Sequence, residues 1–399
     1  MPTASPSAVV LGTSMTALSV VRSLGRRGVR VVVCEVGKPL IASHSKYVRQ
    51  SIACDTEGEL VERLLTRGLG GASPVVLIPT TDEYLLLLSR SRPALHASFR
   101  YLFPPAHSLE SLVGKQSSAE LFRRLEIPAP KTVYLPRDGS ATEAASELRV
   151  PLIVKPNLHA SWLSNPLFLY EFGHQKVILV ERSDSLVPLL ERLLDFDDLV
   201  LQEYLPGESS RLYYFVGYRA RGGAMLASFL GRKHRTLPEG LGTEVLFESV
   251  HNVEAERTAI QALDKLDYVG IAGVDLKFDG RDRTFKVIEI NFRFGSSDGL
   301  AVACGMDLPY VAFTDAVGRE ALPSGGYACG VFWNWLERDI DWLRDHRESQ
   351  GYSVIRWCWH HLTHRYHYPY FALDDLTPWL VELGRFLMRV VRRVLPATG

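Results

Sequence analysis

One stretch near residue 290 constrains the fold most, because it places polar residues at alternate positions of an otherwise apolar strand. Residues 285–297 read FKVIEINFRFGSS, and the period of two puts Glu289, Asn291 and Arg293 on one face. That face is expected to include Val287, and the opposite face Ile288, Ile290 and Phe292. Burying three polar groups together costs free energy unless side chains, a metal ion or a ligand pair with them.

The preceding segment predicts the hairpin partner of this strand. Residues 270–280 read GIAGVDLKFDG, which has the pattern of a strand and ends in an Asp-Gly turn signal. If Asp279 lies opposite Phe285 in an antiparallel pair, then Asp275 lies opposite Glu289 on the same face. The hairpin is therefore expected to bring two carboxylates together.

Two carboxylates that face each other at about 5 Å repel one another, so this pattern leaves two interpretations. In the first, the oxygen ligands hold Mg²⁺ and leave coordination sites for phosphate oxygens. In the second, a structural ion pair joins Asp275 or Glu289 to Lys277 or Arg293.

Composition narrows the class of protein. The chain has 399 residues, 46% of them hydrophobic, which is enough for two or three subdomains. Its formal net charge is zero, which argues against nucleic acid as the main partner. Five scattered cysteines without a CxxC motif, no signal-peptide pattern and no apolar run of about 20 residues predict a soluble, cytoplasmic protein.

The N-terminal segment predicts a parallel sheet. The sequence AVVLGTSMTALSVVRSLGRRGVRVVVCEV has the pattern of a βαβ unit, and PVVLIPTTDEYLLLLSR repeats the theme. Gly12 is followed by Thr13, Ser14 and Met15, and the later glycines of a dinucleotide-binding motif are absent. A Rossmann-like subdomain that lends residues to a pocket is favoured, and an NAD-type oxidoreductase stays as an alternative.

Several cationic residues occur at the ends of predicted elements between these two regions. Lys155 ends the short apolar strand PLIVKPN, and Lys115 begins a helix before a proline-rich linker. The segment GRKHR adds Lys233 between two further basic residues. Cations spread in this way, together with the carboxylate hairpin, are typical of a triphosphate site.

This set of residues resembles the ATP-grasp superfamily, specifically its carboxylate–amine ligase-like members, relatives of D-alanine–D-alanine ligase and D-aspartate ligase. The resemblance covers about residues 8–320 and rests on VLGTSMTALSVVRSLGRRG, IPTTDEYLLLLSR, KPN, LVLQEYLPGE, GRKHRTLP and, above all, the hairpin. It implies an α/β plus α+β architecture, the ATP-grasp fold with an N-terminal Rossmann-like domain. The expected parts are that domain (1–107), a linker helix and small lid subdomain (108–204), a large subdomain with the hairpin (205–325), and an aromatic and helical extension (326–399).

The resemblance also implies residue roles. The implied ligands of Mg²⁺, for which Mn²⁺ could substitute, are Asp275, Glu289 and Asn291. The implied ATP contacts are Lys115 and Lys155 at the phosphates, Gln202, Glu203, Tyr204 and Leu205 at the adenine, and Glu208 at the ribose. The implied catalytic cations at the γ-phosphate or acyl phosphate are Lys233 and Arg293. Phe292 stands where the family usually has proline, which leaves the path of the backbone after Asn291 open.

The implied activity is ATP-dependent ligation of a small carboxylate to an amine, both amino-acid-like, through an acyl phosphate with release of ADP and phosphate. A non-catalytic ATP-binding scaffold is a further alternative, and a homodimer is possible because relatives often form one. Asp82, in the turn after a strand, is interpreted either as a reader of the substrate or as a helix N-cap.

The C-terminal segment has two patterns of its own. The sequence PWLVELGRFLMRVVRRVLP predicts a helix whose apolar stripe packs on the body while its arginines are solvated. Contact of this basic helix with an anionic membrane surface is the less favoured alternative. His360 and His364 are spaced to share one helical face, and aromatic packing is favoured over zinc binding there.

Overall fold

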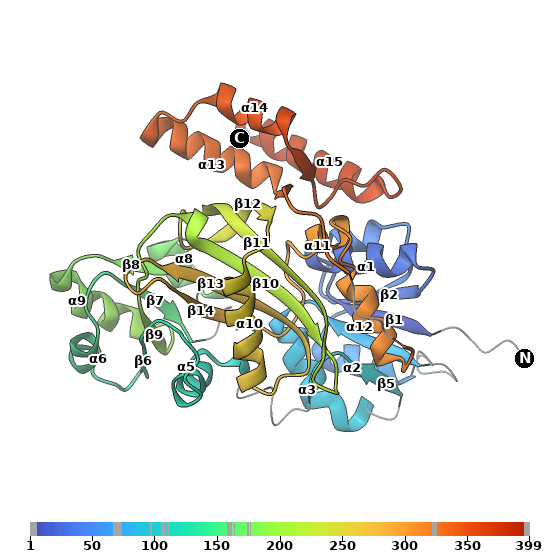
Figure 1. Cartoon of the computed structure of the whole chain (residues 1–399), viewed down its shortest axis with the longest axis horizontal. Helices are drawn as coiled ribbons and strands as arrows, with labels where there is room; N and C mark the ends of the chain where they lie inside the picture. Colours follow the sequence, from blue (N-terminus) through green and yellow to red (C-terminus); the bar gives the residue numbers. More distant parts are fainter. Residues whose placement is uncertain are drawn as a thin grey trace, which may run out of the picture.

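A computed structural model describes residues 6–66, 74–95, 98–104, 109, 112–157, 162, 164–173, 175, 177–320 and 325–394. Three sheets organise these residues, and a layer of C-terminal helices lies above them (Figure 1). The predicted mixed architecture is confirmed: a parallel sheet is followed by two mainly antiparallel sheets.

The first sheet is five-stranded and parallel, in the order β3-β2-β1-β4-β5. Its strands are β1 (Ser7–Leu11), β2 (Arg30–Val36), β3 (Val48–Cys54), β4 (Val75–Pro79) and β5 (Phe99–Tyr101). Its helices are α1 (Met15–Arg26), the 3-10 turn η1 (Ile41–His44), α2 (Glu57–Thr66) and α3 (Asp82–Leu95). The valine-rich central strands are buried on both faces, as parallel strands covered by helices require.

The small subdomain is built on a four-stranded sheet in the order β6-β9-β7-β8. Its strands are β6 (Thr132–Leu135), β7 (Leu152–Pro156), β8 (Ile178–Val180) and β9 (Leu199–Glu203), and its helices are α6 (Ala141–Glu147), α8 (Pro166–Phe172) and α9 (Ser183–Leu194). The linker helix α5 (Lys115–Arg124) precedes them, and its buried Phe122 packs in a cluster shared by the first and large sheets. Trp162 and Phe168, whose rings stack 4.5 Å apart, lie in a core that belongs to this subdomain alone. The subdomain is therefore packed as a separate body.

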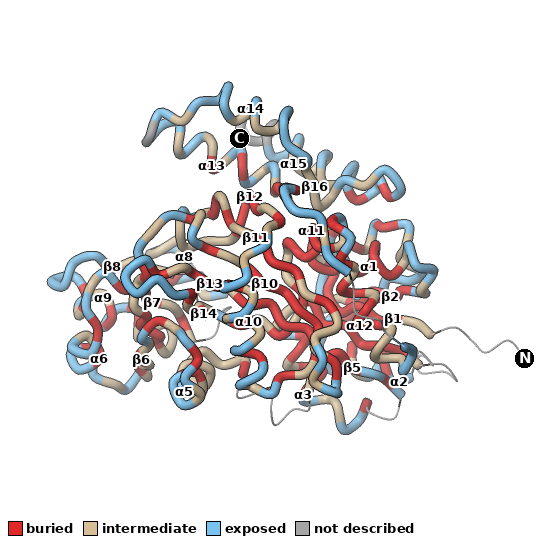
Figure 2. The backbone as a smooth tube through the Cα atoms, in the orientation of Figure 1, coloured by how far each residue is buried: buried red, intermediate tan, exposed pale blue. Residues whose placement is uncertain are grey.

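The large sheet has seven strands in the order β14-β13-β10-β11-β12-β15-β16. Its strands are β10 (Leu212–Arg219), β11 (Met225–Leu237), β12 (Thr243–Ser249), β13 (Gly270–Asp279), β14 (Thr284–Asn291), β15 (Val331–Asn334) and β16 (Arg365–His367). Beside it lie η2 (Ser209–Arg211), α10 (Val253–Lys265), α11 (Gly299–Ala303) and α12 (Leu308–Ala316). Its buried side chains share two hydrophobic clusters with those of the first sheet, so these two parts are packed against each other through both clusters (Figure 2).

The hairpin β13–β14 corrects the expected register. Asp279 pairs with Thr284 and not with Phe285, so the starting point of the sequence-based pairing is wrong by one residue. A β-bulge at Ile288 adds one residue to β14 and restores the predicted pair of Asp275 and Glu289.

The bulge also changes which side chains share a face. The apolar side chains that enter the core are Phe285, Val287, Ile290 and Phe292. The side chains that line a cavity on the other face are Ile288, Glu289, Asn291 and Arg293. The expectation that Val287 lies beside the polar residues and Ile288 among the apolar ones is therefore wrong, because a bulge breaks the period of two.

The C-terminal segment forms α13 (Leu336–Gln350), α14 (Val354–Thr363) and α15 (Thr377–Val394). Its strands β15 and β16 complete the large sheet, so the expected extension from residue 326 is joined to the large subdomain by backbone hydrogen bonds. Within the described residues no helix has the length and apolar character needed to span a bilayer. His360 and His364 stack on each other 4.0 Å apart, and no metal-binding group of three or more histidine, cysteine or acidic residues occurs in the described ranges.

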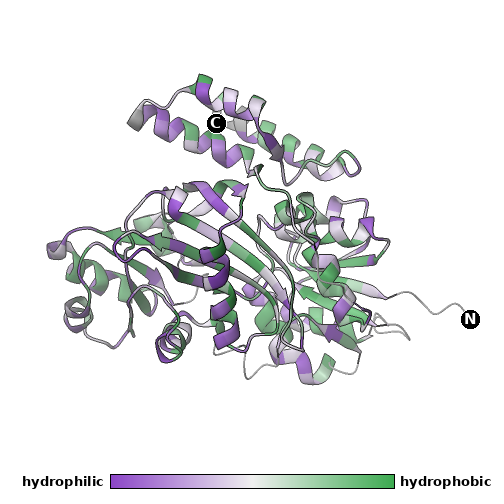
Figure 3. Cartoon of the chain, in the orientation of Figure 1, coloured by the Kyte–Doolittle hydropathy of each residue, from purple (hydrophilic) through white to green (hydrophobic). Residues whose placement is uncertain are grey.

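Helix α15 is oriented opposite to the expectation. Leu380, Leu383 and Leu387 are 36–55% exposed, and hydrophilic and hydrophobic residues alternate along the helices of this layer (Figure 3). On the other side of the helix, Arg389 pairs with Glu337 of α13 at 2.5 Å, and Val381 packs against the core. The prediction that the leucine stripe packs on the body is therefore wrong, because these leucines are exposed and the helix is attached through Val381 and the ion pair of Arg389 with Glu337.

Candidate active site

A cavity of about 340 Å³ lies between the small subdomain and the large sheet. Eleven of the twelve predicted site residues line it: Lys115, Lys155, Gln202, Glu203, Tyr204, Leu205, Lys233, Asp275, Glu289, Asn291 and Arg293. Glu208 is the exception, since it is exposed just before η2 and does not line the cavity. The chain thus gathers residues that are up to 178 positions apart, from Lys115 to Arg293.

The opposed carboxylates form one wall of the cavity. Asp275 on β13 is paired in register with Glu289 on β14, and Gly273 is paired with Asn291. Burial raises the pKa of Asp275; Lys233 opposes this shift, and the nearby Glu244 and Glu289 reinforce it. A site that concentrates acidic oxygens in this way favours a bound cation.

Lys233 on β11 lies between two of these acidic groups. Its Nζ donates to Asp275 Oδ1 at 2.7 Å and lies 3.3 Å from Glu244 Oε2. Burial opposes the charge of Lys233, but the two carboxylates outweigh it and hold its pKa above the usual value. The ion-pair interpretation expected Lys277 or Arg293 as the partner of Asp275. The observed partner is Lys233. Glu244 was not predicted from the sequence, because no motif or periodicity marks this residue. Only its short distance to Lys233 in the folded chain places it in the site.

Two lysines, one on the linker helix α5 and one on β7, approach the cavity from the other side. Lys155 Nζ donates to Gln202 Oε1 at 2.9 Å, and Lys115 Nζ donates to the carbonyl oxygen of Pro156 at 2.7 Å. Burial lowers the pKa of Lys115 to about 8 and also lowers that of Lys155. The Glu289 carboxylate partly opposes the lowering of both pKa values, so both lysines lie near the hairpin, where they could also contact an anionic ligand.

The far end of the cavity is lined by the segment after β9. The carboxylate of Glu203 accepts from Arg281 at 2.7 Å, and the Tyr204 ring lies 4.8 Å from Lys277 Nζ. Burial lowers the pKa of Lys277 to about 8. Lys277 was not assigned to the site, although it follows Asp275 by two positions and the strand period could have found it.

Arg293 joins the hairpin to the first sheet. Its Nε and Nη2 donate to the two carboxylate oxygens of Asp82 at 2.9 and 3.0 Å. Asp82, at the start of α3, therefore holds Arg293 in the cavity wall. Phe292, in place of the family's proline, is buried and packs on Tyr268 with the ring centroids 4.6 Å apart.

Side chains occupy the space around the turn after β1, where a dinucleotide would bind. Thr13 N donates to Glu35 Oε2 at 2.8 Å, and Tyr84 donates its hydroxyl proton to the same carboxylate. A Cβ added at Gly12 would lie 2.3 Å from Thr80 Oγ1. The acid at the end of β2, which a dinucleotide ribose would need, is thus already bonded. This geometry argues against the oxidoreductase alternative.

Known proteins share the overall fold that surrounds this cavity. No family model matches the sequence. A curated D-aspartate ligase of Enterococcus faecium (strain Aus0004) is 23% identical over 324 residues, covering 77% of this chain and 76% of that protein. N5-carboxyaminoimidazole synthetase from Staphylococcus aureus, complexed with ADP, has a TM-score of 0.65 at 13% identity over 86% of each chain. An L-amino acid ligase from Bacillus licheniformis has a TM-score of 0.58 at 12% identity over 80% of this chain and 75% of that one.

These similarities agree with the fold and with the cavity. The chain therefore has the ATP-grasp fold, and over most of its length its sequence is similar to that of a carboxylate–amine ligase.

Proposed function

We propose that the protein joins a carboxylate to an amine at the expense of ATP, through an acyl-phosphate intermediate. The observation that carries the proposal is the convergence of opposed carboxylates from β13 and β14 with buried lysines of α5 and β7 in one cavity. The similarity to a D-aspartate ligase and to an L-amino acid ligase supports the same class of reaction.

In the proposed reaction a carboxylate oxygen of the acid attacks the γ-phosphorus of ATP. The bond between that phosphorus and the bridging oxygen breaks, which releases ADP and leaves an acyl phosphate. The amine then attacks the carbonyl carbon, phosphate departs with the bonding electron pair, and the nitrogen loses a proton. No enzyme nucleophile is needed, so the protein contributes positioning, neutralisation of charge and exclusion of water.

The donor set of Asp275, Glu289 and Asn291 fits a hard divalent cation, because all three offer oxygen atoms from neighbouring strands. Mg²⁺, or Mn²⁺ in its place, would neutralise charge on the phosphates when bound there. Lys233 holds Asp275 in place through one carboxylate oxygen.

The remaining proposed roles are those that the family resemblance implies, and the positions of these residues in the cavity support them. Lys115 and Lys155 are proposed to bind phosphate oxygens, and Lys155 also borders the adenine end through Gln202. The adenine would lie against the segment that continues from Gln202 to Leu205. Lys233 and Arg293 are proposed to face the transferred phosphoryl group. Glu208 is exposed outside the cavity in this arrangement, so a ribose contact would need movement of the η2 turn.

The test is ADP release by purified protein with ATP, Mg²⁺ and a panel of amino acids and carboxylic acids, headed by D-aspartate. Glu289→Gln keeps the shape of the side chain and should lower ADP release by about 10²–10³-fold. Glu254→Gln, an exposed glutamate on α10, is the matched control and should retain full activity.

Equal turnover in Glu289→Gln and the wild type would remove the proposed role of the hairpin. Binding of ATP with no phosphate release across the whole panel would favour the non-catalytic scaffold. Circular dichroism and thermal unfolding of both variants show whether the fold is retained.

A further inference from the structure

A second cavity, of about 750 Å³, adjoins the nucleotide cavity. The two share six lining residues, which form the passage between them: Thr16, Val177, Leu241, Gly242, Thr243 and Ser296. Ser296 donates to Glu244 Oε1 at 3.1 Å, next to the pair of Glu244 and Lys233. The passage thus opens beside the groups that are proposed to face the transferred phosphoryl group.

Three parts of the chain build the walls of this second cavity. The start of η1 contributes Leu40 and Ile41, the segment from β11 to β12 contributes Leu237 and Val245, and the C-terminal layer contributes the third part. Apolar and aromatic side chains dominate the interior: Met15, Leu40, Ile41, Leu237, Pro238, Leu241, Val245, Trp335 and Tyr370. The charged residues are Arg338, Asp345, Glu382 and Arg385. All four belong to α13 and α15 of the C-terminal layer.

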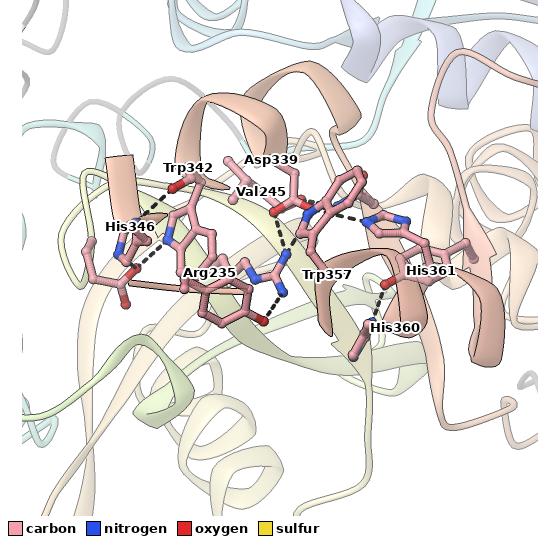
Figure 4. A network of polar contacts seen from close by, with 12 residues as sticks. Arg235, Val245, Asp339, Trp342, His346, Trp357, His360 and His361 are labelled. Carbon is pink, nitrogen blue, oxygen red and sulfur yellow. Dashed lines mark hydrogen bonds and ion pairs between the residues drawn. The ribbon is translucent and has the colours of Figure 1, made fainter. Parts of the chain in front are cut away.

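Two buried ion pairs fix the C-terminal layer over the cavity. Arg235 of β11 donates to both carboxylate oxygens of Asp339 at 2.8 and 3.0 Å, and Trp357 donates to the same carboxylate at 2.8 Å (Figure 4). Arg22 of α1 donates to Asp375 at 2.9 Å and to the carbonyl oxygen of Tyr370 at 2.8 Å. These contacts hold α13 and the Tyr370 segment as rigid walls of the cavity.

The size and chemistry of the cavity select its occupant. Ligand cavities of about 300–1,000 Å³ accommodate drug-sized molecules. An amino acid as small as aspartate would leave most of this space unfilled and would bring its polar side chain against apolar walls, which costs free energy. A bulky apolar group would instead bury its surface against the aromatic rings and displace water.

We propose that the second cavity binds a substrate with a bulky apolar body, aromatic or branched alkyl, and that the C-terminal layer determines this specificity. The inference rests on the proposed ligase function, because the reacting group of that substrate would lie in the passage at Thr16 and Ser296. This substrate is either the acid or the amine of the ligation. The apolar body is the same in the two cases, and the first experiment distinguishes an acid from an amine.

The first experiment measures binding without turnover. Calorimetry in the presence of ADP and Mg²⁺ compares phenylalanine with alanine and aspartate, and also compares phenylpropanoate with phenethylamine to separate acid from amine. Binding of at least one phenyl compound about tenfold or more tighter than that of alanine or aspartate is expected. Equal or tighter binding of the small compounds would overturn the proposal.

The second experiment narrows the cavity. Leu40→Trp adds volume at its exposed rim, and Leu65→Trp, equally exposed on α2 and away from the cavity, is the matched control. Leu40→Trp should weaken binding of the phenyl ligand about tenfold or more and leave ATP binding unchanged. An equal effect of the two variants would overturn the proposal.

The two proposals can fail separately. Tight binding of phenyl compounds without ADP release in any combination would uphold the second cavity and contradict the ligase function. ADP release only with small amino acids, together with weak phenyl binding, would uphold the ligase and overturn the second cavity.

Discussion

The β13–β14 hairpin and the C-terminal layer differ in how their buried charged groups are paired. The hairpin places Asp275 and Glu289 opposite each other, and burial, reinforced by Glu244 and Glu289, raises the pKa of Asp275 despite its ion pair with Lys233. A bound cation can relieve this conflict. The C-terminal layer buries a fully bonded charge, Asp339, and leaves leucines of α15 exposed. The hairpin thus holds opposed carboxylates that repel each other, whereas the buried carboxylate of the C-terminal layer is fully hydrogen-bonded. This difference predicts a functional role for the hairpin and a structural role for the layer.

The largest expected effect tests the functional half of this comparison. Asp275→Asn should lower ligation by about 10²–10³-fold, because one of the opposed oxygens loses its charge. The free energy of unfolding should change by less than about 1 kcal/mol, since Lys233 keeps Glu244 as a partner. ADP release and urea unfolding measure the two quantities. A large loss of stability with intact turnover would reverse the comparison.

The next effect tests the structural half. Asp339→Ala leaves the buried guanidinium of Arg235 unpaired and should lower the free energy of unfolding by about 3–5 kcal/mol. Replacing both partners, Arg235→Met with Asp339→Leu, should recover most of this loss because neither buried charge remains. If urea unfolding shows equal losses for the single and double variants, the ion pair is not the cause.

A smaller effect concerns the two lysines of the cavity whose pKa is lowered by burial. Because burial lowers the pKa of Lys115 to about 8, its charge is lost as pH rises through 8. ATP affinity should therefore fall by up to about tenfold per pH unit above pH 8. Calorimetry from pH 7 to pH 9 measures this change.

Lys115→Arg, which stays charged, should flatten that dependence, whereas Lys265→Arg at the end of α10 should leave it unchanged. The free energy of unfolding of the ATP-free protein should instead rise with pH. The folded pKa lies below the usual 10.5, so the unfolded state binds more protons between about pH 8 and 10.5, and stability rises over that window. A flat ATP affinity in the wild type would contradict the burial of Lys115.

The smallest effect concerns the exposed stripe of α15. Leu383→Gln should change the free energy of unfolding by less than about 0.5 kcal/mol, because the side chain is already partly in water. The buried Leu300→Ala of α11 should cost about 2–5 kcal/mol. A loss above about 1 kcal/mol in Leu383→Gln would mean that another surface covers this stripe in solution.

Sequence patterns predicted most of the site but not its internal bonds. The alternation in residues 285–297 found Glu289 and Asn291, and the turn signal found the hairpin. The pair of Asp275 and Glu289 was predicted from a register that is off by one, and the bulge at Ile288 compensates. A bulge leaves no mark in the hydrophobic pattern beyond one extra residue, so periodicity alone could not locate it.

The sequence by itself determined the βαβ units, the hairpin and the acidic and basic residues that line the candidate active site, because periodicity and turn chemistry act over a few neighbouring residues. Only the tertiary structure decided that Glu244 and Asp275 share Lys233, that Asp82 holds Arg293, and that α15 turns its leucines outward. These contacts join residues far apart in the chain, and their free energies depend on burial and on the charges that meet there. Neither quantity exists until the sheets have packed.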